Sequence, residues 1–279
     1  MSKDSEPFIL PMPGTLGAPQ YIFLDDGKEN SQVVPTESKY KDIIINNNMN
    51  KKPVSKLICE RIKSSNARYW AGDNISEFIN EDEKDQLVNE LTEKFEGVLD
   101  SLIIDRYTDP NSQGTARRLA KMYVYEIMSG RYEARPDATS FPNHTDEPYT
   151  GMLVVRSELR SMCSHHHQPV NGVAYIGLIA ADRLIGLSKY TRIAQWCARR
   201  GTLQEELAMD IAREIMKATG SEDVAVYIQA THGCCENRGI MAHSSLTQTT
   251  VLKGAFKTDA ATKKEFMDNI KLQQEFAPR

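Results

Sequence analysis

Two short segments of the sequence combine cysteine with histidine. Residues 163–167 read Cys-Ser-His-His-His, and residues 232–234 read His-Gly-Cys. Thiolate and imidazole are common ligands of zinc, and catalytic zinc sites have three protein ligands and a fourth position for water. The simplest such set is Cys163, His166 and Cys234. These residue types therefore predict a zinc site that takes part in catalysis.

Two more histidines beside the predicted ligands are candidates for proton transfer. Zinc can lower the pKa of a water ligand to about 7, which supplies a hydroxide nucleophile at neutral pH. A histidine that does not bind the metal can move protons to and from the substrate. We expect His165 and His232 to do so, and we interpret His167 and Cys235 as bystanders.

The alternative interpretation of both segments is structural. A histidine run can lie on the surface without a function, and free cysteines are often buried small hydrophobic residues. Any one of these residues alone fits this alternative about as well as it fits a metal site. Each segment, however, is expected at a strand end and pairs cysteine with histidine, which favours the metal site.

A group of basic residues predicts a pocket for a small anion such as a triphosphate. Lys189 and Arg192 follow Gly186 at a predicted helix start, where backbone N–H groups also favour phosphate. Further members of the group are Arg238, Arg118 and Lys121, the last two sharing a helix face. For Arg199 and Arg200, the solvent-exposed face of a helix is the better interpretation.

One acidic residue is a candidate for base recognition. Glu205, which follows Gln204, can accept hydrogen bonds from the N–H edge of a guanine. By pattern alone, an exposed glutamate on a helix is at least as good an interpretation. The residues themselves leave both alternatives open.

Hydrophobic periodicity predicts the elements that position these residues. Apolar spacings of three and four predict a helix from Glu81, and a second helix from Thr115, its N-cap, to Gly130. The apolar face of the first helix is formed by Leu87, Leu91, Phe95, Val98 and Leu102. After Gly186 we expect a helical region that is broken at Gly201.

Strands are predicted where apolar and β-branched residues gather or alternate. These segments are 152–162, 173–180, 224–230 and 246–252. A short helix near 260–270 completes the order α-α-β-β-α-α-β-β-α. The third strand delivers His232 and Cys234 at its end.

Composition limits the class of protein. The 279 residues include 34 Lys and Arg against 38 Asp and Glu, a formal charge of −4, which disfavours a nucleic-acid binder. The start of the chain lacks a secretory pattern, and the longest apolar run, 173–181, is too short to span a membrane. Five cysteines, an odd number, favour reduced thiols. We therefore expect a soluble, cytoplasmic protein.

Taken together, these motifs resemble GTP cyclohydrolase I, a zinc-dependent family of the tunnelling fold. The resemblance covers residues from about Glu81 to Ile270. The motifs that carry it are TARRLAKMYV from Thr115, CSHH from Cys163, GLSKYTR from Gly186, LQE from Leu203, HGC from His232, RG from Arg238, and the Thr-rich strand before GAF at Gly254. It implies an α+β tunnelling fold: an antiparallel sheet with helices on one face, preceded by a helical pair and an extension.

The resemblance also implies roles for single residues. It makes Cys163, His166 and Cys234 zinc ligands, and it gives His165 and His232 proton-transfer and substrate-positioning roles. The substrate residues that it implies are Gln204 and Glu205 for guanine; Ser188, Lys189, Arg192 and Arg238 for the triphosphate; and Arg118 and Lys121, from another subunit. It further implies a homodecamer of two pentamers with active sites between subunits. We expect three regions: 1–75 as a partly irregular extension that has no counterpart in the family, 76–135 as the helical region and 136–279 as the catalytic domain.

The implied reaction opens the guanine imidazole ring of GTP and yields dihydroneopterin triphosphate and formate, for folate, another pterin or a 7-deazaguanine. Two positions depart from the family pattern: Ser164 stands where a glutamate is usual, and Ala116 stands where a proline is usual. Because Ser164 can alter substrate choice, the alternatives are a protein that uses dGTP or a catalytically weakened nucleotide-binding scaffold. A further alternative is a nitrile reductase of the same fold, but such an enzyme would not need zinc ligands from two separate segments, so their presence argues against it.

Overall fold

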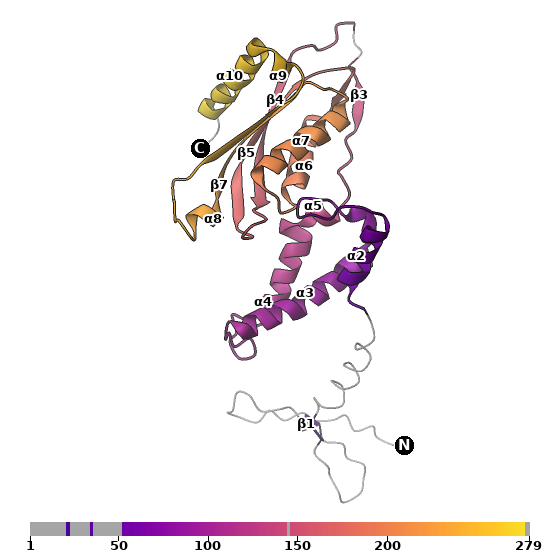
Figure 1. Ribbon diagram of the computed structural model, residues 1–279, viewed down its shortest axis with the longest axis vertical. Helices are drawn as coiled ribbons and strands as arrows, with labels where there is room; N and C mark the ends of the chain where they lie inside the picture. The colour runs from indigo at the N-terminus through magenta and orange to yellow at the C-terminus, as the bar shows by residue number, and fades with distance from the viewer. Residues whose placement is uncertain (1–20, 23–33, 36–51, 144–145, 277–279) are drawn as a thin grey trace, which may run out of the picture.

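The computed structural model of this chain describes residues 21–22, 34–35, 52–143 and 146–276. Most of the predicted extension before residue 52 lies outside these ranges. The two short pieces, β1 (Tyr21–Ile22) and β2 (Val34–Pro35), pair antiparallel. The remainder forms a helical region and an α+β domain (Figure 1). The predicted boundaries at residues 75 and 135 stay predictions.

Among the described residues, six helical segments precede the sheet. They are α2 (Val54–Ser64), the 3-10 helix η1 (Ser76–Phe78), α3 (Glu81–Ser101), α4 (Thr115–Lys121), the π-helix η2 (Met122–Ile127) and α5 (Ser129–Tyr132). Helix α3 begins at Glu81 because of a capping box. The Asn80 side chain accepts from the Glu83 backbone N–H at 2.9 Å, and the Glu83 carboxylate accepts from the Asn80 N–H at 3.1 Å.

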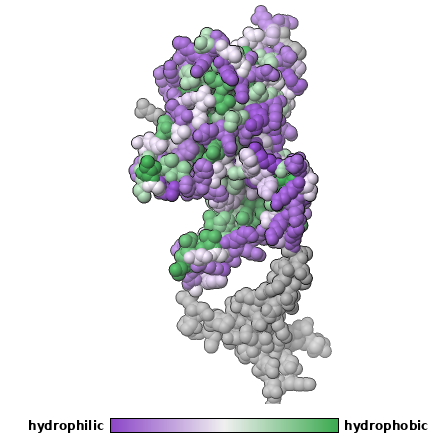
Figure 2. Space-filling view, viewed as in Figure 1, coloured by the Kyte–Doolittle hydropathy of each residue, from purple (hydrophilic) through white to green (hydrophobic). Residues whose placement is uncertain are grey.

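The apolar face predicted for α3 is covered along only part of its length. Leu87, Leu91 and Phe95 pack into a cluster with α2, a helix that the sequence analysis did not predict although its buried residues recur at spacings of four. Farther along the same face, Val98 is 51% exposed and Leu102 is 64% exposed. Figure 2 shows apolar residues gathered on this projecting helical hairpin. The exposed end of α3 is therefore an apolar surface of the single chain.

The second predicted helix is present but differs at both ends. Gly114, with φ +72°, is the N-cap of α4, so Thr115 is the first helical residue and its side chain does not cap the helix. Gly130 does not end the helix either, because it lies inside α5. The close packing of α5 on the next domain explains this glycine, since a Cβ there would lie 2.0 Å from the Trp196 carbonyl oxygen.

The α+β domain is built on a four-stranded antiparallel sheet. Its strand order is β4 (Met152–Met162), β5 (Pro169–Ile179), β7 (Val224–His232) and β8 (Thr247–Leu252). A separate short pair, β3 (Ser140–Pro142) and β6 (Arg183–Ile185), precedes the helices. Among the described residues, β4 and β8 pair on one side only, so each leaves an open sheet edge.

Helices cover both faces of this sheet. One face packs against α6 (Leu187–Ala198) and α7 (Gln204–Thr219), and the core between them includes Ala174, Ile176 and Leu178 of β5. The intervening Tyr175 faces the other side, where it clusters with Phe256 of α9 (Ala255–Thr258) and Phe266 of α10 (Ala260–Phe276). The α+β class and the helical face are confirmed, and the C-terminal helix covers part of the second face in addition (Figure 1). The predicted elements occur in the predicted order, but the prediction lacked α2, the β3–β6 pair and the short helices.

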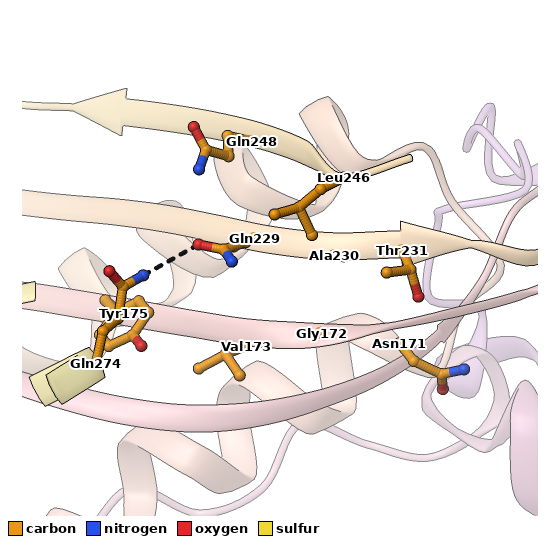
Figure 3. A pocket seen from close by; sticks show the side chains of 10 residues that line it. All are labelled: Asn171, Gly172, Val173, Tyr175, Gln229, Ala230, Thr231, Leu246, Gln248 and Gln274. Atoms are coloured by element: carbon orange, nitrogen blue, oxygen red, sulfur yellow. Dashed lines mark hydrogen bonds between the residues drawn. The ribbon is translucent and has the colours of Figure 1, made fainter. Parts of the chain in front are cut away.

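The second face also contains a hollow of about 610 Å³ beside the end of α10 (Figure 3). Its lining is mostly amide and small side chains, including Gln229, Gln248 and Gln274. The Gln274 amide donates to the Gln229 side-chain oxygen at 3.0 Å (Figure 3). None of the predicted site residues lines this hollow.

In the part of the chain that the structure describes, none of the helices has the length and apolar character needed to cross a membrane. All five cysteines lie in that part, and all five are free thiols, as predicted.

Candidate active site

Strand order brings the two Cys/His segments to the same end of the sheet. Met162 at the end of β4 pairs with Pro169 at the start of β5, and Val170 pairs with His232 at the end of β7. The turn 163–168 therefore lies beside α8 (Gly233–Glu236), the short helix that contains Cys234. Residues about 70 positions apart in sequence meet because β4, β5 and β7 are antiparallel neighbours.

The 163–168 turn has a tight backbone conformation. Cys163 N–H donates to the Gln168 carbonyl at 2.9 Å, and His167 N–H donates to the Cys163 carbonyl at 2.9 Å. His167 closes the turn with φ +50°, and its ring Nδ1 lies 3.3 Å from the Tyr123 hydroxyl of η2. All three histidines of the turn are exposed, and His167 in addition contacts the helical region.

The two predicted cysteine ligands lie in contact. The Cys163 thiol hydrogen-bonds with that of Cys234, and the Cys235 sulfur lies 4.0 Å from the Cys234 sulfur. Burial, the Cys163 thiol and the Cys235 thiol together raise the pKa of Cys234 to about 11. The raised pKa of Cys234 follows because burial and neighbouring thiols favour its neutral form.

The predicted histidine ligand has a different partner. Arg238 donates from Nη1 to Nε2 of His166 at 3.1 Å, so this ring nitrogen carries a lone pair in the structure. Within residues 52–143 and 146–276, no three His, Cys, Asp or Glu side chains are grouped closely enough to hold a metal ion. The structure thus joins Cys163 with Cys234 and His166 with Arg238, as two adjacent pairs.

His232 contacts the first residue of α7. Its ring Nε2 lies 2.7 Å from the Gln204 side-chain oxygen. Burial lowers the pKa of His232, and the negative charges of Glu205 and Glu236 act in the opposite direction. Glu205, exposed in the first turn of α7, therefore lies within electrostatic reach of His232. Gln204, in contrast, is buried.

The basic residues on α6 lie at the other end of the sheet. Ser161, near the end of β4, donates to the Ala198 carbonyl at 2.7 Å, so the last turn of α6 is the one beside the cysteine turn. Ser188, Lys189 and Arg192 occupy the first turns of this 12-residue helix. At about 1.5 Å per residue, Ser188 is roughly 15 Å along the axis from Ala198. Within one chain, therefore, the predicted metal residues and these predicted phosphate residues lie at opposite ends of the sheet.

Arg118 and Lys121 belong to the helical hairpin. Arg118 donates to the backbone carbonyls of Gln113 and Asn111, at 2.9 and 3.0 Å, and so braces the loop before α4. Lys121 is exposed, two residues before Tyr123, the residue that contacts His167. Sequence analysis missed Tyr123, because a tyrosine on a helix gives no local sign of its tertiary partner.

Comparison with known proteins agrees with this architecture. The model of the family described as GTP cyclohydrolase I matches residues 91–271. A GTP cyclohydrolase 1 of Flavobacterium johnsoniae is 41% identical over 200 residues, which cover 71% of this chain and 86% of that protein. Proteins of the same name from Aeromonas salmonicida (41% over 187 residues; 64% and 84% covered) and Vibrio vulnificus (36% over 198 residues; 70% and 88% covered) are also similar.

A sheet with the HGC and CSHH segments at one end, flanked by two helices on one face, defines a hydrolase of the tunnelling fold. The chain belongs to the GTP cyclohydrolase I family. The predicted family is thereby confirmed, whereas the roles of the individual site residues stay predictions.

Proposed function

We propose that this protein hydrolytically opens the guanine imidazole ring of GTP and releases formate and 7,8-dihydroneopterin triphosphate. The observation that carries the proposal is that strand pairing brings the Cys/His segments 163–167 and 232–235 to one sheet end, in a chain of this family. Synthesis of folate, of another pterin or of a 7-deazaguanine would each begin with this step.

The donor set fits zinc. Two thiols from separate strand ends already touch, and His166, on the same turn as Cys163, has a lone pair on Nε2, which now accepts from Arg238. Sulfur and imidazole nitrogen are the ligand types that zinc prefers. Cys163, His166 and Cys234 would hold the ion, and Arg238 would then give up its hydrogen bond to His166. When bound, zinc supplies a Lewis acid and lowers the pKa of water.

The chain's own side chains bind the base and move protons. Glu205, exposed beside His232, accepts hydrogen bonds from the guanine N–H edge. His232 takes and returns protons as the imidazole ring of the substrate opens, and the exposed His165 is the second histidine within reach of this end of the sheet. Arg238, freed from His166, is available to the phosphates.

The triphosphate pocket is completed by a second copy of the chain. Ser188, Lys189 and Arg192 lie at the far end of α6, so they face the nucleotide held by a neighbouring copy. Arg118 and Lys121 are likewise supplied by a further copy. The open edges of β4 and β8 and the exposed apolar end of α3 support such self-association, because each leaves surface that a second copy can cover. A homodecamer of two pentamers is the assembly that we propose.

Assay of the zinc-loaded full chain tests the activity. GTP and dGTP are supplied separately, and formate release and pterin absorbance are followed together. We expect both products from GTP, and release at least about 100-fold slower from the matched His232→Ala variant. Product from dGTP alone would show that dGTP is the substrate, and we would attribute this change in substrate choice to Ser164. Nucleotide binding without formate release from either substrate would contradict an enzymatic role.

A further inference from the structure

We propose that Gln204 is a positioning residue that keeps the hydrogen of neutral His232 on Nε2 and the lone pair on Nδ1. Proton transfer by His232 then takes place at Nδ1 alone. The inference rests on the proposed proton-transfer role of His232. It replaces the expectation that the Gln204 side chain binds guanine.

The position of Gln204 makes it unusual among the predicted site residues. It is the first residue of α7, it is only 4% exposed, and its side chain lies against β7 and β8. The amide nitrogen lies 3.4 Å from the Ile228 carbonyl, 3.3 Å from the Thr247 carbonyl and 3.2 Å from the Thr249 hydroxyl. The amide oxygen lies 2.7 Å from His232 Nε2. Both ends of the side chain are thus engaged inside the protein.

These neighbours determine which way the amide must face. Backbone carbonyl oxygens only accept hydrogen bonds, so the NH2 group has to point at Ile228 and Thr247. The reversed amide would place its own oxygen against two carbonyl oxygens in a buried site, which is unfavourable. The orientation is therefore set by chemistry and does not depend on telling nitrogen from oxygen by position.

The amide orientation in turn determines the tautomer of His232. The Gln204 oxygen is an acceptor without a hydrogen, so the ring nitrogen facing it must be the donor. Nε2 consequently carries the hydrogen, and the lone pair of the neutral ring lies on Nδ1. The same hydrogen bond also restrains rotation of the ring. A methyl or methylene group in place of the amide would remove both effects.

Two measurements test this proposal on the zinc-loaded full chain. The first records the ring-nitrogen signals of 15N-histidine-labelled protein by solid-state NMR, with His232 assigned by its loss in His232→Asn. We expect a protonated Nε2 and an unprotonated Nδ1 in the wild type, and a mixture of tautomers in Gln204→Met. Gln248→Met is the matched control, since Gln248 is an exposed glutamine on the opposite face of β8. It should retain the wild-type pattern.

The second measurement separates kcat from KM for GTP. Loss of a positioning partner should lower kcat of Gln204→Met by about 10–100-fold and leave KM nearly unchanged. A raised KM with unchanged kcat would overturn the proposal in favour of direct substrate binding. A hydrogen on Nδ1 in the wild type, or an unchanged Nε2–H tautomer in Gln204→Met, would overturn it without any reference to turnover. The NMR result therefore stands even if the wild type releases no formate, an outcome that counts against the proposed function only.

Discussion

The carbonyl oxygen of Trp196 lies 2.0 Å from the position that a Cβ atom on Gly130 would occupy. This contact joins α5 of the helical region to α6 of the sheet domain, so the absence of a side chain at residue 130 sets how closely the two parts approach. Trp196 also donates from its ring nitrogen to the Glu133 carbonyl at 3.0 Å, which strengthens the same junction.

Gly130→Ala should therefore destabilise the protein. The added methyl group forces α5 and α6 apart, and overpacking of this kind costs about 1–3 kcal/mol in the free energy of unfolding. Denaturant unfolding followed by circular dichroism measures the change. Gly97→Ala is the matched control, because nothing lies within 4 Å of a Cβ there and the residue is inside α3. It should raise stability by about 0.5–1 kcal/mol. Equal effects of the two substitutions would contradict this account.

Ser55→Ala should weaken the attachment of α2 to α3 in a pH-dependent way. Burial alone would raise the pKa of Glu90, but hydrogen bonds from the Ser55 hydroxyl and N–H, with help from Lys94, lower it. The unfolded carboxyl titrates near 4.5. Stability from a depressed folded pKa is fully present above that value and is lost as pH falls through the folded pKa.

The expected cost of Ser55→Ala at neutral pH is about 1 kcal/mol in the free energy of unfolding. This difference from wild type should shrink as pH falls below about 4.5. Thermal unfolding at a series of pH values checks it, with the exposed Ser64→Ala as the control on the same helix. A difference that grows on acidification would show that the Ser55–Glu90 pair does not stabilise the fold.

Cys234→Ser should lose zinc and activity together. A serine hydroxyl is a much poorer zinc ligand than a thiolate. Metal content per chain, measured by elemental analysis after gel filtration, is the direct readout. Cys235→Ser is the matched control: its sulfur lies 4.0 Å from that of Cys234, but it is not a proposed ligand. Full zinc content in Cys234→Ser, or its loss in Cys235→Ser, would show that the ligand assignment is wrong.

His232→Ala should retain zinc and lose turnover. Removing a positioned acid–base group costs about 100-fold to 10,000-fold in rate. The zinc content should equal that of wild type, because His232 is not among the proposed ligands. Unchanged formate release by the variant would remove His232 from the mechanism.

Mixed assemblies should reveal whether the site is shared between copies. Cys234→Ser and Lys189→Ala are each expected to be inactive, since one lacks a metal ligand and the other a phosphate contact. If each site takes these residues from different copies, an equal mixture has about a quarter of its sites intact. Activity of co-expressed chains measures this fraction. Cys234→Ser with Cys163→Ser is the control that should stay inactive, and failure of the first pair to recover would place the whole site in one chain.

Local pattern was sufficient to predict most of the elements. The spacing of Leu207, Ile211 and Ile215 gives α7 its buried face, and the β-branched residues of 224–230 predict β7. Both signals arise from the regular repeat of the helix or strand backbone, so they can be recognised without knowing which element packs against them. The two Cys/His segments are likewise predicted to form one site from the sequence, because each follows a strand that the local pattern predicts.

Other features depended on contacts between distant segments, and only the tertiary structure decided them. Helix α2 has an apolar repeat, Val54, Ile58 and Ile62, that the sequence analysis overlooked, but only the structure shows that this face packs in one cluster with α3. Gln204 and Glu205 are adjacent in sequence, yet one is buried against β7 and β8 while the other is exposed, because α7 rotates successive side chains by about 100°. Antiparallel pairing brings Cys163 to Cys234 and carries Lys189 to the opposite end of the sheet. The sequence alone therefore determined which groups are present and on which elements, and the packing of those elements decided which groups act together.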